Sequence, residues 1–186
     1  MGFHTFDTDE AERLEQPGTR YRWVSAEEVV EPFLSSSIEV VADLGSGTGF
    51  YTDDVAPYVE TLYGVDLQPE MHEFYRQKGV PTNVELVDSD IVSLPFADDE
   101  LDGAFSTMTF HEFGTPAAID ELARVIETDG VLSVFDWSAD GNGDGGPPRT
   151  ERYGIHDAEA MLTDAGFAVS SAVQRTETLA IEARAP

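Results

Sequence analysis

The sequence contains no cysteine, which excludes disulfide bonds, thiolate metal ligands and a cysteine nucleophile. It also has no apolar run long enough to span a bilayer. Residues 1–15 are polar and acidic, without the basic and apolar regions of a signal peptide. These absences predict a cytoplasmic protein that does not associate with a membrane.

Positive charge is scarce as well. The 186 residues include 10 Lys and Arg against 37 Asp and Glu, and the formal net charge is -27. The acids are spread along the whole chain, so their repulsion destabilises a compact fold in dilute salt. At molar salt the Debye length falls to about 3 Å and most of that repulsion is screened. We therefore predict a halophilic, salt-requiring protein, and no nucleic-acid binding, because neutralising phosphates requires clustered Lys and Arg.

Short apolar runs and helical patterns alternate along the chain. Strands are predicted at 39–45, 61–67, 83–89, 101–108, 130–137, 167–173 and 178–184. Helices are predicted at 24–34, 50–59, 69–78, 116–127 and 157–165. The alternation is typical of an α/β protein with a mostly parallel sheet covered on both faces. We expect a Rossmann-like, doubly wound, seven-stranded sheet whose last strand is antiparallel.

A glycine-rich loop joins the first predicted strand to the next helix. The stretch "VVADLGSGTGF", residues 40–50, contains three glycines at alternate positions: Gly45, Gly47 and Gly49. Glycines there permit positive φ and a close approach to a ligand. The dinucleotide fingerprint G-x-G-x-x-G would need a glycine where the chain has Phe50. The spacing instead favours a ligand that needs close backbone contact and, at Asp43, an acceptor for an ammonium group.

Two further acids follow the next strands. Asp66 lies about 20 residues past the glycine loop, where an acid can accept both hydroxyls of a ribose. A strand-end Asp can equally be solvated. Asp90 could accept from an adenine amino group while Ile91 packs on the ring; alternatively, Asp90 or its neighbour Asp88 merely caps a turn.

In this order, "VADLGSGTG", "GVDL", "DSDIVSLPF" and "ELARVIETDGVLSVFDW" resemble the motifs of class I S-adenosylmethionine-dependent methyltransferases over residues 38–136. Within that family the chain is most similar to the small, single-domain, type 11-like group that acts on small molecules. The resemblance implies S-adenosylmethionine as cofactor, S-adenosylhomocysteine as product and a small-molecule methyl acceptor. It implies cofactor contacts for Asp43, Gly45, Ser46, Gly47, Gly49, Asp66, Leu67, Asp90, Ile91 and Ser106.

The resemblance also divides the chain, which we expect to form one methyltransferase domain over 1–186. We expect an N-terminal helical cap at 1–37 and the cofactor-binding core at 38–136. The glycine- and proline-rich segment 137–152 predicts a flexible loop near the acceptor site. Residues 153–186 are expected to form the C-terminal helix and strand pair.

Four residues are candidates for binding the methyl acceptor or accepting its proton. His111 could accept a proton from the acceptor, or simply pack at the pocket wall. Trp137 could wall the acceptor site, and His4 could fold over the cofactor or pack. Arg152 could hold an acceptor carboxylate or phosphate, or pair with acids at the surface. No metal site is predicted, because the four histidines lie far apart in sequence.

Three functions stay open at this point. The first is methyl transfer to a small molecule by in-line displacement, in which alignment alone can supply about 7–11 kcal/mol. The second is a nicotinamide-dependent oxidoreductase, which would need the glycine missing at Phe50 and a hydride-transfer set that is not found. The third is a non-catalytic S-adenosylmethionine-binding protein, since alignment requires no obligatory catalytic residue. The sequence does not predict an oligomeric state.

Overall fold

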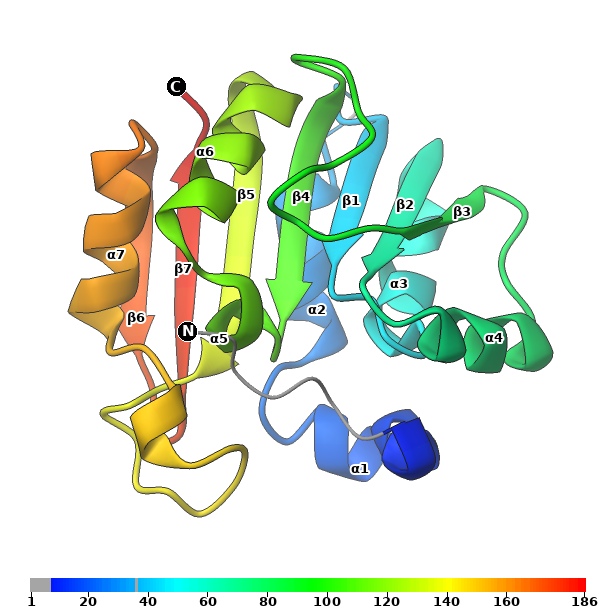
Figure 1. Ribbon diagram of the computed structural model, residues 1–186, viewed down its shortest axis with the longest axis horizontal. Helices are drawn as coiled ribbons and strands as arrows, with labels where there is room; N and C mark the ends of the chain where they lie inside the picture. Colours follow the sequence, from blue (N-terminus) through cyan, green and yellow to red (C-terminus); the bar gives the residue numbers. More distant parts are fainter. Residues whose placement is uncertain (1–7, 36) are drawn as a thin grey trace.

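The computed structural model describes residues 8–35 and 37–186. Seven strands form one sheet in the order β3-β2-β1-β4-β5-β7-β6 (Figure 1). Their bounds are β1 Val40–Leu44, β2 Thr61–Asp66, β3 Val84–Asp88, β4 Leu101–Thr107, β5 Ile126–Trp137, β6 Ala168–Gln174 and β7 Thr178–Arg184. The strand order reverses between β1 and β4, which is where ligands bind in sheets of this kind.

The first five strands run parallel, and β7 is antiparallel to both β5 and β6. The predicted α/β class, the doubly wound sheet and the antiparallel last strand are therefore confirmed. Because β1 to β5 are parallel, their carboxyl ends meet at one edge of the sheet, the lower edge in Figure 1.

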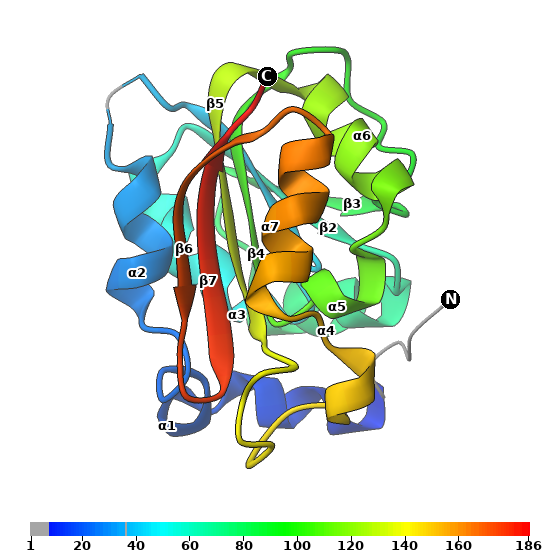
Figure 2. The ribbon, with the colours of Figure 1, turned by 90° about the vertical axis from the view of Figure 1, so that its left-hand side faces the viewer.

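Helices cover both faces of the sheet (Figure 2). The helices on one face are α2 Ala26–Val30, α3 Phe50–Val55 and α4 Pro69–Lys78, and those on the other are α5 Phe110–Phe113, α6 Pro116–Val125 and α7 Ile155–Asp164. A 3-10 helix, η1 Thr8–Glu15, and α1 Pro17–Arg20 lie beneath the carboxyl ends of the strands (Figure 1). Three short 3-10 helices complete the set: η2 Glu31–Phe33, η3 Ala56–Tyr58 and η4 Arg149–Glu151.

Three predicted helices are shorter than expected. The one predicted over 50–59 ends at Val55 and changes to the 3-10 turn η3, which contains Pro57. The other two are those predicted over 24–34 and 116–127. The first begins after Ser25, whose hydroxyl accepts from the Glu28 N–H in a capping box, but it changes to a 3-10 turn at η2, which contains Pro32. The helix predicted over 116–127 ends at Val125, because Ile126 already pairs with Leu101 as the first residue of β5. Sheet pairing thus overrides the helical period there.

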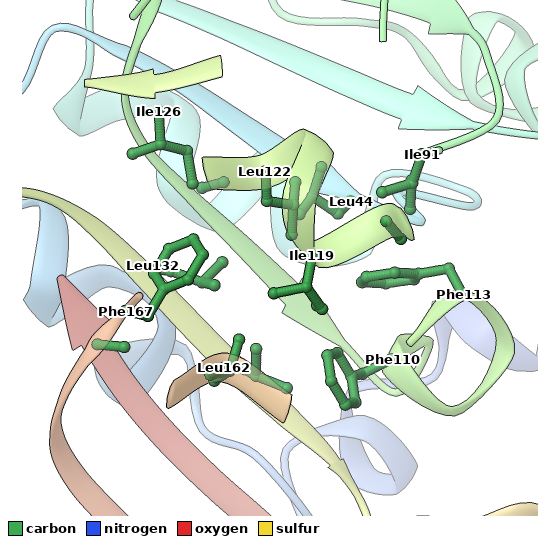
Figure 3. Packing of buried hydrophobic residues seen from close by; sticks show 14 of the residues in the cluster. Leu44, Ile91, Phe110, Phe113, Ile119, Leu122, Ile126, Leu132, Leu162 and Phe167 are labelled. Carbon is green, nitrogen blue, oxygen red and sulfur yellow. The ribbon is translucent and has the colours of Figure 1, made fainter. Parts of the chain in front are cut away.

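Two apolar clusters fix the sheet between its helices. Figure 3 shows one of them, in which Phe110 of α5, Ile119 and Leu122 of α6 and Leu162 of α7 gather with Leu132 of β5. The other cluster joins the face of α2, α3 and α4 to the same strands. Burial on both faces makes the carboxyl edge a rigid platform. Within the described ranges, no helix has the length and hydropathy needed to cross a membrane.

Candidate functional site

The glycine loop leaves β1 and enters α3 with all three glycines at positive φ, between +54° and +81°. A Cβ atom on Gly45 would lie 2.3 Å from the side chain of Thr109, and one on Gly49 would lie 2.1 Å from the ring of Tyr75. At Gly47 the nearest such atom, on Leu14, is 3.8 Å away. Packing therefore requires Gly45 and Gly49, whereas Gly47 presents bare backbone to open space.

That space is a cavity of about 520 Å³, here named the first cavity. It lies between the glycine loop, the ends of β2, β3 and β4, and the cap. Seven of the predicted cofactor residues line it: Gly45, Ser46, Gly47, Asp66, Leu67, Asp90 and Ile91. Three do not line it: Asp43, Gly49 and Ser106. The Ser106 hydroxyl donates to the Leu44 carbonyl at 3.0 Å, which ties β4 to β1 behind the cavity.

Asp66 connects the glycine loop to the end of β2. Its Oδ2 accepts from the Gly47 N–H at 2.7 Å, and its Oδ1 accepts from the Gln68 N–H at 2.8 Å. Burial raises the pKa of Asp66 against these two hydrogen bonds. Each carboxylate oxygen keeps a further lone pair for a ligand hydroxyl. Nearby, Ile91 is buried, whereas Leu67 is exposed at the cavity rim.

Asp43 and Arg20 carry unsatisfied buried atoms next to this cavity. Oδ2 of Asp43 accepts from the Thr52 hydroxyl at 2.7 Å, but Oδ1 is buried without a partner. Burial raises the pKa of Asp43 to about 7, and the charge of Arg20 opposes that rise. Nε of Arg20 is also buried without a partner, and burial lowers the pKa of Arg20. Unsatisfied buried polar atoms are rare in folded proteins and indicate a place for a ligand.

A second cavity of about 810 Å³ adjoins the first. Five residues line both cavities: Leu14, Arg20, Tyr51, Met108 and Glu112. The second cavity extends from the cap to the predicted loop and includes Trp23, Trp137 and Pro147 in its walls. At the junction Met108 has a φ of 61°, an unusual backbone conformation for this side chain and one that concentrates at functional sites.

His111 lines the second cavity and is held by Asp136, at the end of β5. Its Nδ1 lies 3.0 Å from both Asp136 carboxylate oxygens, and its backbone N–H donates to Oδ2 at 2.5 Å. Burial alone would lower the pKa of His111, but the carboxylate of Asp136 outweighs it and raises the pKa. An Nδ1–H that donates to Asp136 leaves Nε2 as the proton acceptor.

Glu112 is the second titratable group at the junction. Its Oε1 lies 3.8 Å from Nε2 of His111. Burial raises the pKa of Glu112 to about 7, against the pull of His111. Glu112, which exchanges its proton near neutral pH, therefore stands where the cavities join, with His111 beside it in the second.

The guanidinium of Arg152, a predicted contact of the acceptor or of acids, is surrounded by groups of the chain itself. It is buried, its Nε donates to the Pro147 carbonyl at 2.8 Å, and its guanidinium also donates to the carbonyls of Gly145 and Ser138. Nη1 lies 3.6 Å from Glu177. The donors that could hold an acceptor carboxylate are thus occupied by the chain, and the partner acid is buried rather than at the surface.

The loop over 137–152 is held in place by hydrogen bonds and packing, although its composition predicts flexibility. The carboxylate of Glu177 accepts from the N–H groups of Gly143 and Asp144 at 3.0 and 3.1 Å. The backbone of Gly146 packs against Trp137, because a Cβ atom added to Gly146 would come within 2.3 Å of the indole. In the same turn as Glu177, Arg175 pairs with Glu28 of the cap.

Several residues of the site carry no signal in the sequence. Arg20, Met108 and Glu112 gain their positions from tertiary packing. His72 is fully buried on α4, 3.2 Å from the Ser46 hydroxyl and 2.5 Å from Asp88, so it ties the glycine loop to the end of β3. His4 lies outside the described residues. Within 8–35 and 37–186, no group of His, Asp and Glu side chains has the arrangement of a metal site.

The comparisons with known proteins agree with this geometry. Residues 42–134 match the family model described as "Methyltransferase domain". A solved structure of a SAM-dependent methyltransferase from Aquifex aeolicus superposes with a TM-score of 0.87 at 29% identity, over 98% of this chain and 100% of that one.

Curated relatives match a shorter part of the chain. Demethylmenaquinone methyltransferase from Corynebacterium kroppenstedtii is 36% identical over 101 residues, 54% of this chain and 42% of that protein. Probable tRNA methyltransferase 9B from Mus musculus is 36% identical over 103 residues, 53% of this chain and 22% of that protein. The chain spans half or less of the length of the first curated relatives that it matches.

Proposed function

Because this chain belongs to the methyltransferase domain family, we propose that it transfers a methyl group from S-adenosylmethionine to a small-molecule acceptor by in-line displacement. The observation that carries the proposal is the position of Asp66, whose carboxylate lies at the first cavity against the bare backbone of Gly47. The acceptor would occupy the second cavity, which adjoins the first at Met108 and Glu112.

The residues of the first cavity fit the cofactor. When bound, S-adenosylmethionine supplies its methyl group as an electrophile on a positively charged sulfur. Asp66 would hold the ribose hydroxyls, and Asp90 and Ile91 would hold the adenine. The unsatisfied Oδ1 of Asp43 supports a positive group close to the glycine loop. Acids outnumber cations among the charged side chains of this cavity, as a positively charged ligand requires.

His111 would act as the general base. Its Nε2 would accept the proton that the acceptor loses, and Asp136 would stabilise the resulting imidazolium. Glu112, whose pKa is about 7, could pass that proton on to solvent. The His111–Asp136 pair also disfavours a non-catalytic binding protein, which would have no need of a proton acceptor at this junction.

A small acceptor is favoured over RNA because the second cavity has the volume of a small-molecule pocket. The names of the relatives include both a demethylmenaquinone and a tRNA methyltransferase, so an RNA acceptor is the alternative. The proposal includes a cytoplasmic location and action without nucleic acid or a membrane.

Calorimetry in molar KCl tests the cofactor assignment. S-adenosylhomocysteine should bind with micromolar affinity and NAD should not bind. NAD binding without S-adenosylhomocysteine binding would contradict the proposal. Transfer of a labelled methyl group should then be followed in two parallel reactions, one with a metabolite extract and one with a tRNA pool. Label in the low-mass fraction is expected, and label in the RNA alone would establish the alternative.

A further inference from the structure

The two cavities differ in the sign of the charged side chains that line them. Among the residues that the structure describes, one cation and three acids line the first: Arg20, Asp66, Asp90 and Glu112. In the same part of the chain, three cations and two acids line the second: Arg13, Arg20, Arg22, Glu112 and Glu151. The whole chain has only 10 Lys and Arg and a net charge of -27, so three arginines around one cavity mark a local reversal of the field. That reversal favours an anion in the second cavity.

Arg20 adds an unsatisfied donor to this field. Its Nε is buried without a hydrogen-bond partner. Its guanidinium carbon lies 4.9 Å from the ring centre of Tyr51, which also lines the second cavity. An Nε–H that has lost water without gaining an acceptor raises the free energy of the folded chain, and a ligand oxygen carrying negative charge would compensate.

The far wall of the second cavity is aromatic. Trp23 of the cap and Trp137 of β5 meet edge to face, with ring centres 5.1 Å apart. The guanidinium of Arg22 lies 4.6 Å from the ring centre of Trp23. Gly146 of the fastened loop packs on the other indole. A rigid aromatic wall of this kind favours a planar ligand body, because aromatic rings pack against one another edge to face or offset with little loss of conformational freedom.

From these observations we propose that the second cavity binds a planar organic acid as the methyl acceptor. The acid group pairs with the arginines of the cap, chiefly Arg20 and Arg22, and the planar body lies on the tryptophan wall. The atom to be methylated then points toward His111 and Glu112, which enter the cavity from the sheet edge. This inference rests on the proposed function, because it names the chemical class of the acceptor.

The experiment uses the full chain saturated with S-adenosylhomocysteine in molar KCl, with benzoate and its uncharged analogue benzamide as probes. Trp23 and Trp137 are the two tryptophans of the chain, so intrinsic fluorescence reports on this cavity. Benzoate should bind about tenfold more tightly than benzamide, the ratio expected for a hydrogen bond to a charged group. Arg20→Gln and Arg22→Gln should each remove most of that ratio.

Arg76→Gln is the matched control, because Arg76 lies on α4 and pairs with Glu73 at 3.8 Å. It should leave both probe affinities unchanged. If Arg20→Gln does not fold, as judged by circular dichroism, Arg22→Gln carries the test, since Arg22 is exposed.

Three outcomes would overturn the inference. Equal affinity for benzoate and benzamide would show that the arginines do not select an anion. Weaker S-adenosylhomocysteine binding in Arg20→Gln, with the benzoate preference intact in both variants, would assign the arginine to the carboxylate of the cofactor. If benzoate and benzamide do not displace each other, and a tRNA pool binds tightly, the arginines would be assigned to RNA phosphates. In the first two cases binding of S-adenosylhomocysteine by the unchanged protein leaves the proposed function standing, and in the third it leaves the cofactor assignment standing while the acceptor becomes RNA. Loss of S-adenosylhomocysteine binding by the unchanged protein would instead remove the proposed function first.

Discussion

The two adjoining cavities are assembled in different ways. The first is built mainly from consecutive strand ends and the loops that follow them, each within a few residues of a recognisable motif. The second brings together the cap, the short helix α5, the end of β5 and the loop that follows it. Local sequence therefore specifies the first cavity, whereas tertiary packing specifies the second. The same division predicts that variants can damage one cavity without damaging the other.

His111→Ala should show the largest difference between its effect on the rate of methyl transfer and its effect on cofactor affinity. Loss of a general base lowers the rate of methyl transfer by about 10²–10⁴-fold, and S-adenosylhomocysteine affinity should not change, because His111 does not line the first cavity. Single-turnover transfer of a labelled methyl group measures the rate. The matched control is His156→Ala, whose side chain is 92% exposed on α7. A rate equal to that of the unchanged protein would mean that alignment alone supports catalysis.

Asp66→Ala should produce the reverse pattern. It removes a charged acceptor of the Gly47 N–H together with the proposed ribose contact, so S-adenosylhomocysteine affinity should fall by about 10–100-fold. Benzoate binding at the second cavity should change far less. Calorimetry gives the first affinity and tryptophan fluorescence the second, with the exposed Glu70→Ala as control. Unchanged cofactor affinity would refute the ribose role.

Arg152→Met should disturb the second cavity through its wall. The variant leaves Glu177 without its guanidinium partner and frees the carbonyls of Pro147 and Gly145, so the melting temperature should fall by several degrees. The benzoate preference should shrink while S-adenosylhomocysteine affinity holds. Arg184→Met, on the exposed end of β7, is the control. If cofactor affinity fell by the same factor as benzoate affinity, the two cavities would not be independent.

The smallest expected effect is a shift in pH dependence. His111 must be neutral to accept a proton, so the rate should rise with pH through its raised pKa, above 6.5. Asp136 raises this pKa, and burial, together with Arg152, lowers it. In Asp136→Asn the midpoint of the rate profile should therefore move to lower pH. Glu112→Gln should keep the rising limb and move its midpoint less, because Glu112 raises the pKa of His111 by a smaller amount than Asp136 does. If the midpoint does not move in Asp136→Asn, the rise of the rate with pH reports a group other than His111.

The comparisons confirm the predicted methyltransferase family and class and S-adenosylmethionine as its cofactor. The sequence could predict these because each motif is local. The glycine loop, Asp66 and Asp90 each follow a strand whose apolar run is plain, and a parallel sheet then brings them to one edge. The predicted strands match for the same reason, except that β5 begins earlier because Ile126 pairs with Leu101.

The rest of the site depends on contacts that no local pattern encodes. Gly49 is needed because of Tyr75, 26 positions later in the chain. The surroundings of Arg152 depend on a loop whose composition suggests disorder but whose carbonyls converge on one guanidinium. Arg20 becomes notable only when its buried Nε is found without a partner. The cap roles foreseen for His4 stay predictions.

The turn between β6 and β7, residues 175–177, touches neither cavity but holds parts of the second on both sides. Arg175 forms an ion pair with Glu28 of the cap. Glu177 accepts hydrogen bonds from Gly143 and Asp144 of the loop over 137–152. Substitutions in this hairpin could therefore change the shape of the second cavity while leaving His111 and the first cavity unchanged. Variant libraries that search for new acceptors should therefore randomise residues 175–177 together with Trp23 and Trp137.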